Sequence, residues 1–176
     1  QGLIHWQGYA LGRSSNMLSC YKQGALFRPH TGTDENRFCR GIGVQLQKNA
    51  FELAAFVSKK KIDANIITDT INNDAWASSL LLSGLHRTKN EWMDKKALQI
   101  FIAGANLKLN SRLGKTSLNI IHTAFDHPIK KREEPYNRFA INGKQWQNAS
   151  IDHAVSTRMG FLFGELAMDK KGNRAM

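Results

Sequence analysis

The chain has 176 residues, of which 41% are hydrophobic and 22% charged, and its formal net charge is +11. These proportions are too polar for a bundle of membrane helices, and no apolar run approaches the roughly 20 residues that a transmembrane helix needs. A membrane β-barrel is not excluded, because its strands need only about 10 residues each and alternate in polarity. The basic excess favours anionic partners such as lipid headgroups, lipopolysaccharide phosphates or nucleic acid.

The start of the chain and its cysteines say little about its origin. Neither a charged nor an apolar leader segment follows Gln1, so we expect a processed mature protein or an internal segment. Cys20 and Cys39 are isolated and match no metal-finger spacing. We therefore expect two ordinary thiols in preference to a disulfide.

Alternation of apolar and polar residues with a period of two is the main structural signal. It predicts an opening strand over residues 2–11, which carry Trp6 and Tyr9. In residues 38–47 the even positions are mostly apolar, and after Lys48 and Asn49 the alternation resumes at Phe51. A tight turn between two matching runs predicts a β-hairpin.

The rest of the chain predicts a short helix and two more strand pairs. The helix lies in the long connection of residues 59–96, where Thr88 can cap it and Glu91 stands three residues later, as in a capping box. Strands over residues 97–110 and 116–125 flank a turn at Gly114. Strands over residues 148–157 and 159–168 flank Arg158, although His153 interrupts the apolar side.

Short turns alternate with long connections along the chain. The long connections are residues 59–96 and 126–145, and outer-membrane barrels likewise have short periplasmic turns and long outer loops. We therefore predict an all-β fold, an antiparallel up-and-down meander that forms part of an outer-membrane β-barrel. Residues 1–176 form one segment without a domain boundary. About seven strands can be counted, fewer than the smallest closed single-chain barrels contain, so we expect this segment to belong to a longer chain.

Five parts of the sequence carry a family resemblance: QGLIHWQGYALGRSS, FRPHTGTDENRFCRG, FELAAFVSKKKIDANI, SGLHRTKNEW followed by DKKAL, and PYNRF followed by NASIDHA. In this order they resemble the large outer-membrane barrel region of Bacteroidetes proteins whose N-terminal part carries helix-hairpin-helix motifs. The resemblance implies a bacterial outer-membrane location and helix-hairpin-helix modules upstream. It implies DNA handling at the cell envelope only through those modules, and it transfers no catalytic residue.

Residues with catalytic or metal-binding potential form no convincing site. His122 and His127 flank Asp126, but residues five apart on a strand point to opposite faces, so we favour solvent-exposed or lumen histidines. No nucleophile elbow and no Gly-rich phosphate loop occurs in the sequence. We therefore assign no catalytic residue, no cofactor and no metal.

Basic clusters mark the expected contacts with anionic partners. We favour a headgroup-facing rim over specific nucleic-acid binding for these clusters. The candidates are Lys59, Lys60, Lys61, Lys130, Lys131 and Arg132.

Aromatic residues gather near the predicted strand ends and loops. We favour an interfacial girdle for them, although the same rings could stack nucleic-acid bases. The candidates are Trp6, Tyr9, Trp76, Trp92, Tyr136 and Trp146.

Three functional hypotheses follow. The first is a barrel wall in the bacterial outer membrane, with a structural, transport or partner-binding role and no catalysis; it contacts outer-membrane lipid or lipopolysaccharide, and its long loops bind ligands or other envelope proteins. The second is a soluble basic β-domain that binds single-stranded nucleic acid. The third is an enzyme with a site assembled from loops, for which the sequence offers no residue set. The period-two pattern does not distinguish an open pore from a packed lumen.

Overall fold

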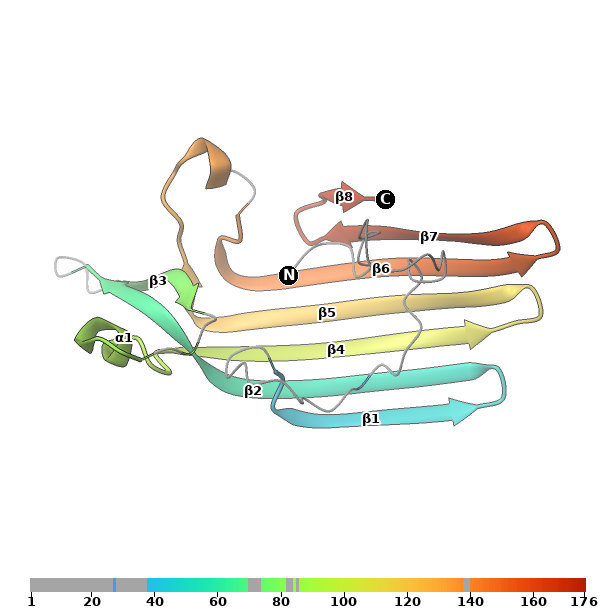
Figure 1. The fold of residues 1–176 in the computed structure, drawn as a ribbon, viewed down its shortest axis with the longest axis horizontal. Helices are drawn as coiled ribbons and strands as arrows, with labels where there is room; N and C mark the ends of the chain where they lie inside the picture. The colour runs from blue at the N-terminus through green and yellow to red at the C-terminus, as the bar shows by residue number, and fades with distance from the viewer. Residues whose placement is uncertain (1–26, 28–37, 70–73, 82–83, 85, 138–139) are drawn as a thin grey trace.

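The computed structural model describes residue 27 and residues 38–69, 74–81, 84, 86–137 and 140–176. These residues form an all-β fold with one short helix (Figure 1). The elements are β1 (Gly41–Lys48), β2 (Phe51–Thr68), β3 (Ala75–Leu81), α1 (Lys89–Met93), β4 (Leu98–Asn110), β5 (Gly114–Ile129), the 3-10 turn η2 (Pro135–Asn137), β6 (Gly143–Thr157), β7 (Gly160–Asp169) and β8 (Arg174–Ala175).

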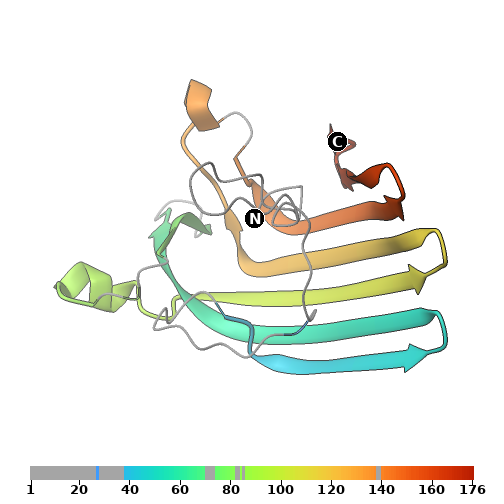
Figure 2. The ribbon, with the colours of Figure 1, turned by 45° about the vertical axis from the view of Figure 1, so that its right-hand side comes forward.

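The strands make one curved antiparallel meander (Figures 1 and 2). The order across the long strands is β1, β2, β4, β5, β6, β7, and every one of these neighbours is antiparallel. The three tight turns lie together at one end of the sheet (right in Figure 1), which we call the turn end. The longer connections lie at the other end, which we call the loop end.

The sheet closes on itself only at the loop end. There β2 continues past its pairing with β4 and forms a second hairpin with β3. β3 in turn meets β5 through one parallel pair, Ala77 with Ile129. This closure surrounds a small apolar core of Ile62, Ala64, Ala77, Leu98, Phe125 and Ile129. We call the face of the sheet that bears this core the inner face, and the opposite face the outer face.

Local sequence explains the turns and the helix. Asn49, a residue that tolerates the left-handed region, adopts φ of 54° in the β1–β2 turn. The Thr88 hydroxyl accepts from the Glu91 N–H, and the Glu91 carboxylate accepts from the Thr88 N–H, which completes the predicted capping box. The predicted short helix is therefore confirmed.

The predicted meander is confirmed, with two corrections to its connections. The prediction of a long loop over residues 59–96 was wrong, because β2 continues to Thr68 and β3 follows it. The loop of residues 126–145 is shorter than predicted, because β5 extends to Ile129 and β6 begins at Gly143. β3 and the two-residue β8 were not predicted. The strand predicted over residues 2–11 lies outside the described residues.

Candidate functional site

The outer face carries two adjacent apolar rows that cross six strands. Direct register partners define the first row: Leu46, Leu53, Leu107, Leu118, Ile151 and Leu166. The second row, two residues along each strand, comprises Val44, Ala55, Ala105, Ile120, Ala149 and Met168. Neither row contains a polar side chain.

These rows are not covered by any other described part of the chain. The six side chains of the first row are each between 42% and 59% exposed, and Val44, Ile120 and Met168 are about as open. On a sheet face that no second layer covers, side chains still shield one another in part. The exposed fractions of these side chains are therefore those of an uncovered face. A contiguous apolar face of this kind marks an interaction surface.

The inner face carries a polar ladder at the same level along the strands. The Asn119 amide donates to the Ser150 hydroxyl at 3.1 Å and to the Asp152 carboxylate at 2.8 Å. Asn119 also accepts from the Asn106 amide at 2.6 Å. The Nζ of Lys108 lies 3.4 Å from a carboxylate oxygen of Glu52. These bonds join β2 to β4 and β4 through β6, and they satisfy polar groups that would otherwise be costly to bury.

Glycine makes room for aromatic rings on the inner face. Gly43, Phe56 and Gly104 are register partners on β1, β2 and β4. A Cβ added to Gly104 would lie 2.5 Å from Cε1 of Phe56, and one added to Gly43 would lie 3.1 Å from the ring of Phe27. The two phenylalanine rings meet edge to face, with 6.1 Å between centroids. The inner face is therefore filled by side chains here.

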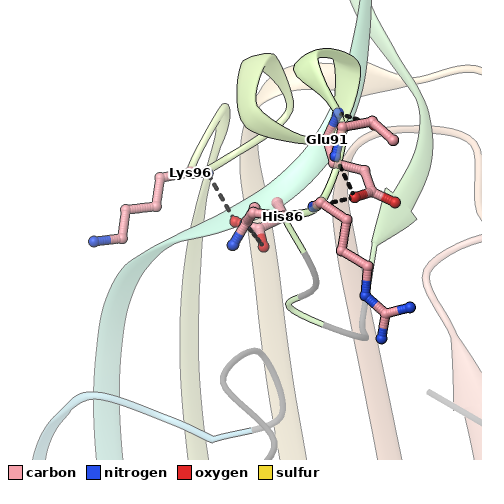
Figure 3. A network of polar contacts seen from close by, with 6 residues as sticks. His86, Glu91 and Lys96 are labelled. Atoms are coloured by element: carbon pink, nitrogen blue, oxygen red, sulfur yellow. Dashed lines mark hydrogen bonds and ion pairs between the residues drawn. The ribbon is translucent and has the colours of Figure 1, made fainter.

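A polar network ties the segment around α1 to β2 at the loop end (Figure 3). Asp63 is 5% exposed, accepts from the Lys96 N–H at 2.8 Å, and lies 3.0 Å from Nε2 of His86. The Ala64 N–H donates to the Asp94 carbonyl at 3.0 Å. Burial and, secondarily, the charge of Asp63 raise the pKa of Asp94.

Sequence reasoning did not single out Asp63 or His86. The sequence feature that could have identified Asp63 is its position between two apolar residues, Ile62 and Ala64. A carboxylate at such a place needs hydrogen-bond partners from another segment.

The structure places the predicted basic residues in several different surroundings. Lys59 and Lys61 are exposed on the outer face, whereas Lys60 alternates to the inner face and holds its Nζ 4.7 Å from the centre of the Phe38 ring. The Nζ of Lys130 lies 5.1 Å from the centre of the Trp76 ring. Lys131 and Arg132 are exposed in the β5–β6 connection and line a shallow depression together with Lys171.

The structure describes the side chains of three of the six predicted aromatics, Trp76, Trp92 and Trp146, and they lie in different parts of the fold. Trp146 packs against the loop-end core, 6.2 Å from Phe125 between ring centroids. Trp92 is 62% exposed on α1, with the Nζ of Lys95 4.6 Å from its ring centre. Trp6, Tyr9 and the side chain of Tyr136 lie outside what the structure describes.

The histidines and the cysteines also have definite places. Nδ1 of His122 lies 3.3 Å from the Gln147 amide nitrogen, and Nδ1 of His127 lies 3.2 Å from the Asp126 carboxylate. In the part of the chain with defined placement, no group of three or more His, Cys, Asp or Glu side chains could hold a metal ion. Cys39 is exposed, and Cys20 lies outside the described residues.

Comparison with known proteins identifies no relative of this chain. No family model matches the chain, and no curated protein or solved structure is significantly similar to it. Among the described residues, no helix is long and apolar enough to cross a membrane. The resemblance to the Bacteroidetes barrel region stays a prediction.

Proposed function

We propose that the chain is a wall segment of an outer-membrane β-barrel in the bacterial envelope, with a structural, transport or partner-binding role and no catalysis. The observation that carries this proposal is the pair of exposed apolar rows on the outer face, backed by a polar ladder on the inner face. Apolar residues outside and polar residues inside are the pattern of strands that cross a lipid bilayer.

The height of the apolar face on β4 supports a bilayer as the covering medium. On β5 and β6 the apolar stretch of the outer face is shorter, because His122 and Gln147 bound it at one end and Thr116 and His153 at the other. On β4 the outward residues from Phe101 to Leu109 are apolar. Eight steps of about 3.4 Å make about 27 Å along the strand. A strand tilt of about 40° reduces this to about 21 Å, close to the apolar band of about 25 Å on outer-membrane barrels.

Backbone pairing also suits a lipid environment. Lipid cannot hydrogen-bond the backbone, so a spanning sheet must pair its strands on both sides. β2, β4, β5 and β6 have long neighbours on both sides, whereas β1 and β7 lie at the edges of the six long strands. Closed bacterial barrels have at least about 8 strands, so we infer that further strands complete the wall.

In this proposal, ligands or partner proteins bind at the loop end of the sheet. There the network around Asp63 holds the α1 segment in one place beside β2. A fixed loop presents its exposed side chains, such as Trp92, with little ordering cost on binding.

Membrane fractionation with a gel assay tests the proposal. The protein expressed in a Gram-negative host is expected in the outer-membrane fraction, and unheated and boiled samples in detergent are expected to migrate differently. Recovery as a soluble monomer without detergent would overturn the proposal.

A soluble nucleic-acid-binding domain is the second candidate. The net charge of +11 and the exposed ring of Trp92 beside the Lys95 ammonium favour it. It requires binding to single-stranded DNA that weakens steeply with salt, and it leaves the bare outer face without a role.

A further inference from the structure

The turn end of the sheet carries a basic rim without acidic residues. Each of the three tight turns has a cation in it or beside it: Lys48 ends β1 just before the first turn, Arg112 lies in the second turn and Arg158 in the third. Lys115 follows the second turn at the start of β5, where its pairing with Ala154 places it on the inner face. All four side chains are exposed, and no Asp or Glu occurs in the three turns. We call Lys48, Arg112, Lys115 and Arg158 the basic rim.

The charges of this rim are not neutralised within the described structure. The acids nearest along the strands, Glu52, Asp152 and Glu165, project from the inner face, which Lys115 shares with them. Glu52 pairs with Lys108, and no ion pair joins a rim cation to an acid of the described residues. Positive charge therefore accumulates at the turn end.

The loop end differs in its charge. Acids such as Asp74, Asp126 and Asp169 are mixed there with lysines. The two ends of the sheet therefore differ in charge. The three turns at the turn end carry cations without acids, whereas the loop end carries both.

Exposed apolar side chains stand beside the rim cations. Leu113 follows Arg112 and is 78% exposed, and Met159 follows Arg158 and is 99% exposed. Lys48 lies on the outer face, one row beyond Leu46. A cation next to an apolar tip at the border of an apolar face suits the boundary between acyl chains and headgroups, where Lys and Arg extend toward phosphate.

We propose that the basic rim binds the anionic headgroups of phospholipids in the leaflet at the turn end, and so fixes which end of the sheet enters or stays at that leaflet. This inference rests on the proposed barrel function. The partner is a phospholipid surface, because the cations are spread along the whole turn end of the sheet instead of converging on one cavity.

The test compares two sets of charge removals. The rim variant is Lys48→Gln, Arg112→Gln, Lys115→Gln and Arg158→Gln. The matched control removes four exposed cations at the loop end that were not predicted to contact anionic partners: Lys89→Gln, Lys144→Gln, Lys170→Gln and Lys171→Gln. Urea-unfolded protein is diluted into vesicles of phosphatidylcholine alone or with about equal phosphatidylglycerol. Insertion is read as heat-modifiable migration on a gel, and initial binding as co-flotation with the vesicles.

We expect the unaltered chain to bind the anionic vesicles at least about tenfold more tightly than the neutral ones, a preference that salt reduces. The rim variant is expected to lose most of this preference, and the control to keep it. Insertion of the unaltered chain without any lipid preference, or equal loss in both variants, would overturn the rim inference and leave the barrel intact. Failure to insert into either vesicle would instead overturn the barrel proposal.

Discussion

Leu107 on β4 and Leu118 on β5 are direct register partners on the outer face, and both are more than two-fifths exposed. On a soluble domain this pair would expose apolar surface to water. In a bilayer it lies in the medium that suits it, since the transfer of apolar surface out of water is favourable.

A single charge at this pair distinguishes the two environments. Leu107→Lys is expected to lower the stability of the inserted protein by about 2–4 kcal/mol, as a lysine on the lipid face near the bilayer midplane does. The measurement is urea unfolding in vesicles. Gln47→Lys adds the same charge to an exposed position on the inner face and is expected to change stability far less. Equal effects of the two substitutions would contradict the assignment of the faces.

The polar ladder depends on Asn119. Asn119→Leu removes the donor to Ser150 and Asp152 and the acceptor for Asn106, so it leaves these groups short of partners. We expect a loss of about 1–3 kcal/mol in the free energy of unfolding. Ile120→Leu, on the next residue and the opposite face, serves as the control with little expected loss. An unfolding midpoint unchanged by Asn119→Leu would show that the ladder does not stabilise the sheet.

Gly104 and Phe56 form a coupled pair on the inner face. Gly104→Ala places a Cβ against the Phe56 ring and is expected to cost about 1–3 kcal/mol. Adding Phe56→Leu frees this space, so the double variant is expected to lose less than the sum of the two single losses. Strict additivity in this double-mutant cycle would refute the close contact.

The capping box of α1 gives a pH dependence. Hydrogen bonds from the Arg87 and Thr88 N–H groups lower the pKa of Glu91. The stabilisation is therefore complete above the ordinary glutamate pKa and is lost as the pH falls through the lower, folded-state pKa. Amide exchange around residues 87–91 is expected to lose protection at acidic pH. Glu91→Gln should remove this pH dependence, and its persistence in that variant would assign it to another group.

The sequence predicted the meander well because its signal is local. Alternation set the faces of the strands, and turn residues such as Asn49 placed the reversals. The continuation of β2 from Lys59 onward was missed, because three consecutive lysines resemble a solvated strand end. In the folded chain, Lys59 and Lys61 project outward while Lys60 lies against Phe38, so alternation continues through the basic run.

The candidate site was predicted only in part for a similar reason. The exposed apolar rows depend on register between strands up to about a hundred residues apart, such as Leu53 and Ile151, and sequence periodicity alone does not give that register. The burial of Trp146 against Phe125 depends on the same pairing. The fixing of α1 through Asp63 depends on how the chain folds back at the loop end.

The most direct test of the central claim is lipid contact measured residue by residue. In a background with Cys20→Ser and Cys39→Ser, single cysteines at Leu118, Asn119, Ser150 and Ile151 are labelled with a small fluorophore, and the protein is inserted into vesicles with brominated lipids. We predict strong quenching at Leu118 and Ile151 and weak quenching at Asn119 and Ser150, because the outer and inner faces alternate along β5 and β6. Quenching that is equally weak at all four positions would contradict a lipid-facing outer surface.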